Sequence, residues 1–176
     1  MKPRLRRLVR TDVDAVVGLC NEAIMCGEST WGPEPVNASL LNARLCENAA
    51  RFEAYVAETA EGHVIGWAGL LPHTDRPVYN VSAELEVFVA KSQRRRGVAR
   101  ALVSQLLARA TALDFHSLLL IVQDQPTRPI AWAVRLGFQS VGYLACVYPA
   151  RGEWRDLLVL EKFLTPELAS PHATQR

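Results

Sequence analysis

The chain has 176 residues, of which 49% are apolar and 22% are charged, and its formal net charge is +2. This length and balance are typical of a single globular domain with a sizeable core, and so small a net charge does not indicate a nucleic-acid-binding protein. The sequence has no apolar run of membrane-spanning length and no signal-peptide pattern, and its four cysteines lack metal-ligand spacing. We therefore expect a cytoplasmic protein with free thiols.

Two helices and a loop are predicted in the N-terminal part of the chain. Residues 1–10 are basic and mark a first strand only weakly. Thr11 and Asp14 match a capping box, and apolar residues at helical spacing follow them, which predicts the first helix. Residues 27–35 contain two glycines and two prolines and are expected to form a loop, after which Asn37 can cap a second helix.

The pattern then changes to strands, which are alternating or wholly apolar runs separated by turn residues. The short apolar run at residues 118–122 is typical of a buried parallel strand, and Pro126, Pro129 and Gly137 bracket a further helix. The predicted strands cover residues 52–58, 64–71, 84–89, 118–122, 139–147 and 154–163. This order of elements indicates an α/β or α+β fold built on one sheet with mixed strand directions.

The stretch over residues 84–103 combines a strand, a basic loop and the start of a helix. Alternation in the strand puts the carboxylates of Glu84 and Glu86 on the same face. The loop carries three consecutive arginines at residues 94–96, and Gly97 follows them. Positive charge is unusual at the start of a helix, because the free N–H groups there are already positive, and a bound anion would resolve the conflict. The alternative is a solvated arginine cluster.

The basic loop resembles the phosphate-binding motif of one enzyme family. Residues 94–99 match the [QR]-x-x-G-x-[GA] motif of the GNAT N-acetyltransferases, in the strand–loop–helix setting where that family carries it. The sequence Leu136-Gly137-Phe138 follows the next strand and helix, as it does in the family. Further segments resemble the subgroup of phosphinothricin and methionine sulfoximine acetyltransferases, so that the similarity covers about residues 8–164. These segments are residues 21–24, 30–31, 34–35, 76–79, 83–84, 87–89 and 152–156.

The resemblance implies one GNAT-like domain over residues 1–164 and a flexible C-terminal tail over residues 165–176. Its central sheet would be mixed and mostly antiparallel, with about six to seven strands flanked by about four helices. The cosubstrate would be acetyl-CoA, no metal would be needed, and the acceptor would be the primary amine of a small molecule such as an amino acid or an analogue. Homodimers are also implied.

The same resemblance assigns CoA to the strand and the basic loop. The pantetheine arm would pair with the edge of the strand, and the pyrophosphate would bind the N–H groups at the start of the helix. The residues assigned to cofactor binding are Val87, Phe88, Val89, Arg94, Arg95, Arg96, Gly97, Val98, Ala99 and Arg100.

Glu84 aligns with the catalytic glutamate of the subgroup and would act as the general base, directly or through water. Glu86 lies on the same face, at a position where the subgroup usually has a small residue. It would hold the substrate ammonium, raise the pKa of Glu84, or pair with an arginine, and for each carboxylate the alternative is a structural ion pair. A backbone N–H near Val87 would meet the oxyanion.

Three more residues are assigned to the acceptor. Arg76 and Tyr79 align with residues at which the subgroup contacts the acidic group of the acceptor, and an arginine fork fits a carboxylate. Trp31, in the first loop, is also assigned to substrate binding. The alternatives are a surface arginine for Arg76 and a cover over the core for Trp31.

The chain departs from the family at positions that help to hold CoA or to protonate the leaving thiolate. Pro126 and Pro129 replace an asparagine and a serine, and Ala133 replaces a histidine or tyrosine. A thiol pKa is only about 1.5 units above neutrality, so losing the acid should cost roughly 2 kcal/mol and slow the chemistry without abolishing it. Thr74 and Ala150 replace an arginine and a lysine, which leaves the identity of the acceptor open.

Two other functions compete with an active acetyltransferase. The first is a CoA-binding module with little or no catalysis, which the two prolines and Ala133 favour. The second is a nucleic-acid or ribosome-associated binder that uses the basic runs at residues 2–10 and 94–96. Neither run contains interleaved aromatic residues, which makes this the least favoured interpretation. We therefore expect a small-molecule partner, no nucleic acid and no membrane.

Overall fold

A computed structural model describes residues 3–47, 51–125, 128–150 and 152–165. In these ranges the chain forms a seven-stranded sheet in the order β1-β2-β3-β4-β5-β7-β6, together with four α-helices. The strands are β1 (Arg4–Arg7), β2 (Ala54–Glu58), β3 (Val64–Leu71), β4 (Ser82–Val89), β5 (Ser117–Gln123), β6 (Gln139–Ala150) and β7 (Glu153–Phe163). The helices are α1 (Val13–Met25), α2 (Ala38–Cys46), α3 (Val98–Ala112) and α4 (Arg128–Arg135). The predicted fold class, a mixed and mostly antiparallel sheet with about four helices, is confirmed.

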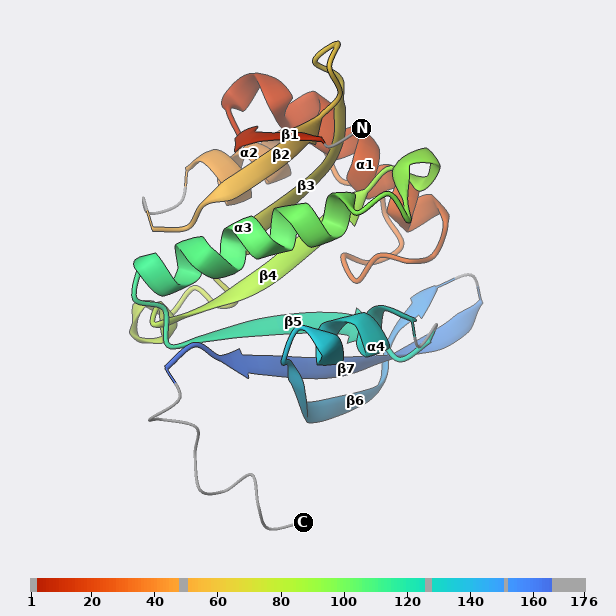
Figure 1. Cartoon of the computed structure of the whole chain (residues 1–176). Helices are drawn as coiled ribbons and strands as arrows, with labels where there is room; N and C mark the ends of the chain where they lie inside the picture. The colour runs from red at the N-terminus through yellow and green to blue at the C-terminus, as the bar shows by residue number, and fades with distance from the viewer. Residues whose placement is uncertain (1–2, 48–50, 126–127, 151, 166–176) are drawn as a thin grey trace.

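The sheet has a core on each face, because successive residues of its strands point to opposite sides. Ala68 and Leu70 of β3 belong to the cluster built around α3 and α4, whereas Trp67 and Leu71 of the same strand pack with α1 and α2. Figure 1 shows α3 and α4 in front of the sheet, with α1 and α2 behind it. The face that carries α1 and α2 is the one that matters for the site.

Strands β4 and β5 are the only parallel neighbours in the described sheet, and they separate soon after they meet. They pair at Ser82↔Ser117, Ala83↔Leu118 and Glu84↔Leu119, although both strands continue for several residues. Figure 1 shows the two ribbons diverging beyond this point. We call the region where β4 and β5 no longer pair the β4–β5 fork. One edge of β4 therefore has no neighbouring strand at the fork.

The local signals in the sequence had mixed success. Asn37 caps α2 as predicted, since its side chain accepts a hydrogen bond from Leu40 N–H at 2.9 Å. The capping box predicted at Thr11 and Asp14 is wrong, because a 3₁₀ turn at Arg10–Asp12 comes before α1 and no side chain caps that helix. A 2.9 Å hydrogen bond from Val9 N–H to the Asp12 carboxylate instead stabilises the entry to this turn.

Some sequence predictions fall outside the described residues, namely Pro126, part of the Lys2–Arg10 run and nearly all of the C-terminal tail. No helix in the described ranges is long and apolar enough to cross a membrane.

Candidate functional site

The two carboxylates of β4 lie on one face of the strand, as the alternation predicts. Their face is the one covered by α1 and α2, while Leu85 between them is buried against α3. Glu86 is 8% exposed and Glu84 is partly buried. Two carboxylates withdrawn from water on the same strand need an explanation, because burial without compensation is costly.

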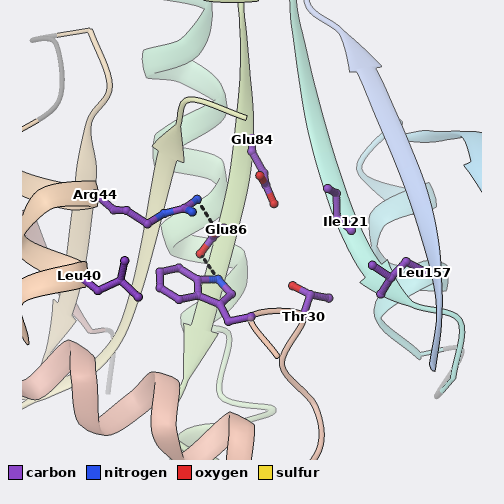
Figure 2. Close-up of a pocket in the computed structure, with 8 residues that line it drawn as sticks. Thr30, Leu40, Arg44, Glu84, Glu86, Ile121 and Leu157 are labelled. Carbon is purple, nitrogen blue, oxygen red and sulfur yellow. Dashed lines mark hydrogen bonds and ion pairs between the residues drawn. The ribbon is translucent and has the colours of Figure 1, made fainter. Parts of the chain in front are cut away.

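Both carboxylates line a cavity of about 270 Å³ at the β4–β5 fork, which we call the Glu84 pocket. Figure 2 shows Arg44 and Leu40 on one side of Glu86, and Glu84 pointing towards Ile121 and Leu157 on the other. The pocket is lined by Thr30, Trp31, Leu40, Arg44, Glu84, Glu86, Ile121 and Leu157. It therefore joins the loop before α2, helix α2 itself and strands from both sides of the fork.

Glu86 is held by two partners from distant parts of the chain. The indole Nε1–H of Trp31 donates to Glu86 Oε2 at 2.8 Å, and the Arg44 guanidinium lies 3.4 Å from Glu86 Oε1. Arg44 also stacks over the Trp31 ring at 4.9 Å from its centroid. Burial and the neighbouring Glu84 nevertheless raise the pKa of Glu86 to about 8, against the lowering effects of Arg44 and Trp31.

Glu84 differs from Glu86 in having no hydrogen-bond partner for its carboxylate among the described residues. Burial raises the pKa of Glu84, and the nearby positive charge of Arg44 partly offsets the rise. A half-buried carboxylate that faces a cavity without a partner is available to accept a proton from a bound molecule.

The free edge of β4 turns alternate main-chain groups towards the fork. Ala90 N–H donates to Ile65 O at 3.0 Å. Phe88 and Glu86, which precede Ala90 at steps of two, therefore also direct their main-chain groups to β3. Val87 and Val89 therefore turn their N–H and C=O groups away from β3 and into the fork. The Val89 carbonyl accepts a hydrogen bond from Arg94 Nε at 3.2 Å.

Phe88 and Val98 lie in the core beside these elements, and their side chains are occupied there. The Phe88 ring stacks on Trp67 with centroids 5.4 Å apart, and Val98, the first residue of α3, is buried. Val98 could therefore contact a ligand only through its main chain, whereas Phe88 directs its side chain to the core and its main-chain groups to β3.

The loop between β4 and α3 has the backbone shape of an anion site. Arg95 has φ 62° and Gly97 has φ 81°, with Arg96 between them outside the left-handed region. Alternation of this kind turns successive N–H groups to the same side, and a non-glycine residue with positive φ costs about 1–2 kcal/mol. In the described part of the chain, no protein acceptor is found for the N–H groups of residues 95–100. A pyrophosphate fits this cradle, because it supplies the acceptors that these N–H groups lack.

The arginines of the loop have different surroundings. Arg94 is engaged within the protein, since its guanidinium pairs with Glu28 at 2.7 Å as well as with the Val89 carbonyl. Arg95, Arg96 and Arg100 are exposed, and Ala99 is half-buried on the first turn of α3. The three exposed guanidinium groups are the ones placed to meet phosphate charge.

Two residues predicted to contact the acceptor are not part of the lining of the Glu84 pocket. Arg76 and Tyr79 are both exposed at a 3₁₀ turn between β3 and β4, and neither is among the residues that line the pocket. Trp31 does line it. Ala133, where the family has a histidine or tyrosine, is fully buried in the core, and Pro129 is exposed on α4.

Sequence reasoning missed Arg44, Thr30, Leu40, Ile121 and Leu157, which line the pocket with the predicted residues. Arg44 follows Leu40 by four residues on the predicted second helix, so the sequence indicates that both side chains lie on the same face of that helix. Nothing in the sequence indicated which face of the sheet this helix face approaches.

Comparisons with known proteins agree with this geometry. The model of the acetyltransferase (GNAT) family matches residues 16–138. The chain is 26% identical to an L-methionine sulfoximine/L-methionine sulfone acetyltransferase of Pseudomonas paraeruginosa, over 97% of this chain and 100% of that protein. It is 23% identical to the phosphinothricin N-acetyltransferase of Alcaligenes faecalis, over 89% of this chain and 80% of that protein.

Among solved structures, a phosphinothricin acetyltransferase from Sinorhizobium meliloti in complex with acetyl-CoA superposes with a TM-score of 0.88 at 24% identity, over 97% of this chain and 92% of that chain. This likeness establishes the fold, and the family match establishes the enzyme class. The chain therefore belongs to the acetyltransferase (GNAT) family and is an N-acetyltransferase that uses acetyl-CoA as its cosubstrate.

Proposed function

We propose that the enzyme acetylates the primary amine of a small amino acid or a close analogue, with Glu84 as the general base. The observation that carries this proposal is the Glu84 carboxylate, which faces the pocket at the β4–β5 fork and has no hydrogen-bond partner within the described protein. The names of relatives that acetylate methionine sulfoximine and phosphinothricin, both amino-acid analogues, support the class of acceptor.

The main chain would hold the cosubstrate along one continuous surface. Val87 and Val89 offer N–H and C=O groups to the pantetheine amides at the fork. The N–H groups of residues 95–100 would bind the pyrophosphate, and the guanidinium groups of Arg95, Arg96 and Arg100 would lie near phosphate charge. The reacting thioester would then lie beside Glu84, where the paired part of β4 ends.

Glu84 supports the reaction by taking a proton from the ammonium group of the acceptor. The neutral amine then attacks the thioester carbonyl and forms the C–N bond, and its nitrogen gives its second proton to water. The C–S bond breaks as the carbonyl re-forms, and the thiolate of CoA leaves. We assign the N–H of Val87 as the donor of a hydrogen bond to the thioester carbonyl oxygen, which gains negative charge during the attack. Since Ala133 is apolar and buried, the thiolate would take its proton from water, at a cost of roughly 2 kcal/mol relative to an enzyme with an acid there.

The test is acetyl-CoA-dependent thiol release with a panel of amino acids, comparing the wild type with Glu84→Gln. We expect Glu84→Gln to lower kcat by about 100-fold or more while the Kd for acetyl-CoA stays within a factor of two to three. Glu153→Gln is the matched control, since that side chain is 73% exposed and is not among the residues that line the pocket. If the wild type binds CoA but acetylates no amine in the panel, the enzyme is a CoA-binding module and this proposal is wrong.

We also propose that residues 1–164 act as one catalytic domain and that the enzyme is a cytoplasmic homodimer. The free thiols of all four cysteines support a reducing compartment. Support for the dimer comes from β6, which is the last strand of the sheet and whose apolar side chains are exposed together with Trp154 of β7. The residues of this surface are Val141, Tyr143, Leu144, Val147 and Trp154. Light scattering of the purified chain measures the molar mass, and a monomer at micromolar concentration contradicts this proposal.

A further inference from the structure

The Glu84 pocket contains one positively charged side chain, Arg44 of α2, among its described lining residues. Arg44 lies beside Glu86 and on the side of it opposite to Glu84 in Figure 2. Its charge reaches Glu84, since it opposes the burial-driven rise in the pKa of that carboxyl. A cation and an unpartnered carboxylate thus face the same small cavity.

The Arg44 guanidinium is held in place from two directions. Its Cζ atom lies over the Trp31 ring at 4.9 Å from the centroid, and one of its nitrogens lies 3.4 Å from Glu86 Oε1. Trp31 is itself fixed by its 2.8 Å hydrogen bond to Glu86 Oε2. A guanidinium carries five N–H donors in a rigid fork, so it can serve Glu86 and a second carboxylate together.

The ion pair between Arg44 and Glu86 is weakened near neutral pH. Burial and the neighbouring Glu84 raise the pKa of Glu86 to about 8, so this carboxyl loses its proton at a higher pH than an exposed glutamate. The titratable and charged groups that face Glu86 are Glu84 on β4, Arg44 on α2 and the Cys20 thiol on α1. The pocket therefore presents a positive group at Arg44 and, once Glu84 has lost its proton, a negative group at Glu84.

We propose that Arg44 binds the carboxylate of an α-amino-acid acceptor, and that Glu86 and Trp31 position its guanidinium for this contact. This inference rests on the proposed function and adds the feature of the acceptor that the site selects. An α-amino acid carries its ammonium and its carboxylate on one carbon, which matches a pocket with Glu84 and Arg44 on its two sides. The apolar side chains of Leu40, Ile121 and Leu157 complete the wall that the acceptor side chain would touch.

The assignment replaces the one suggested by the sequence for the acceptor's acidic group. Arg76 is exposed at its 3₁₀ turn and does not line the pocket. Arg44 does line it, and its side chain is 40% exposed, so a ligand in the pocket can reach it.

The test uses acceptors that differ only in the carboxylate. Each amino acid that the wild type acetylates is compared with its α-amide and with the amine left by decarboxylation. We expect the wild type to prefer the acid by on the order of tenfold to 100-fold in kcat/KM, the range for a charge-assisted hydrogen bond. In Arg44→Gln this preference falls to within about threefold, chiefly through the KM of the acid, while the Kd for acetyl-CoA is unchanged. Loss of Arg44 also raises the pKa of Glu84, so the acid and the decarboxylated amine are compared in each protein on the high-pH plateau of its activity.

Two further variants separate binding from folding. Arg44→Lys keeps the charge and should keep part of the preference, because a lysine lacks the planar fork. Arg44→Gln alone leaves the buried Glu86 carboxyl without its partner, which can destabilise the fold. The double variant Arg44→Gln, Glu86→Gln removes both groups, so it should stay folded even if the single variant does not. Arg10→Gln is the matched control, since Arg10 is 73% exposed and pairs only with the exposed Glu47 in the described chain.

The outcomes distinguish this inference from the proposed function. If the wild type acetylates amines but prefers the amide or the decarboxylated amine to the acid, the role of Arg44 is wrong and the acetyltransferase activity stands. The same conclusion follows if Arg76→Gln, and not Arg44→Gln, removes the preference. If no amine is acetylated at all, the proposed function has failed first.

Discussion

The indole of Trp31 donates a 2.8 Å hydrogen bond to Glu86, and this contact fixes the loop before α2 against the middle of β4. The same loop is tied to the other side of the fork, because the Ser29 carbonyl accepts hydrogen bonds from Tyr148 of β6 at 2.8 Å and from Gln123 of β5 at 3.1 Å. Glu28 adds its ion pair with Arg94 of the loop between β4 and α3. The loop before α2 thus spans both strands that diverge and closes one side of the Glu84 pocket.

The first prediction concerns the hydroxyl of Tyr148. Tyr148→Phe removes its hydrogen bonds to Ser29 O and with Gln123, but the direct bond between those two residues remains. We expect the loop to loosen at a cost of about 1 kcal/mol, which corresponds to a roughly fivefold rise in the KM of the acceptor, with little change in the Kd for acetyl-CoA. Steady-state kinetics with the acceptor varied measures this effect. Tyr55→Phe removes a hydroxyl bonded to Glu53, outside the pocket lining, and an equal rise in that control would contradict the assignment.

The second prediction concerns the pH dependence of catalysis. Glu84 must be ionised to accept a proton, and burial raises its pKa above the usual value of about 4.5. Activity should therefore rise with pH on the acid side, at a higher pH than for an exposed glutamate. Profiles of log kcat/KM against pH measure this limb. Its persistence in Glu84→Gln would show that another group is responsible.

Part of this site could be predicted from the sequence, and the rest depends on how the elements pack in the folded chain. Polar and apolar residues alternate over residues 84–87, so the strand and the shared face of its carboxylates were predictable, and Asn37 marked the start of α2. Arg44 was not predictable as a site residue, because its place depends on how α2 packs on the sheet. The capping box at Thr11 failed because Asp12 lies close enough to accept the Val9 N–H, which a spacing rule does not see.

The third prediction concerns the phosphate loop. Gly97 has φ 81°, and a Cβ there would meet no atom within 4 Å, so Gly97→Ala acts through backbone conformation alone. Alanine in the left-handed region costs about 1–2 kcal/mol, and we expect the loop to shift and the Kd for acetyl-CoA to rise roughly tenfold, measured by calorimetry. Gly18→Ala in α1 is the control, since its Cβ also meets open space and its φ is not positive. This variant should stabilise the helix by roughly 0.5–1 kcal/mol and leave the Kd for acetyl-CoA unchanged. Unchanged binding in Gly97→Ala would place the pyrophosphate elsewhere.

The fourth prediction concerns stability, and its sign follows from the raised pKa of Glu86. The unfolded chain loses this proton near pH 4.5, whereas the folded chain keeps it until about pH 8. Between these values the unfolded state binds fewer protons, so the free energy of unfolding of the wild type falls as pH rises, and it levels off above about pH 8. The glutamine side chain of the Glu86→Gln variant does not titrate. Glu86→Gln should therefore gain about 2 kcal/mol or more over the wild type at pH 8, and the gain should vanish near pH 4.

Urea unfolding of both proteins at several pH values measures this difference directly. The burial of Glu84, whose pKa is also raised, contributes to both curves and largely cancels in the comparison. A matched variant is Glu47→Gln, because Glu47 is exposed at the end of α2 and should give a difference that does not grow with pH. A contrary result would be that Glu86→Gln becomes less stable relative to the wild type as pH rises. Glu86 would then be an ionised partner of Arg44 at neutral pH. In that case less of the positive charge of Arg44 would be available to an acceptor carboxylate.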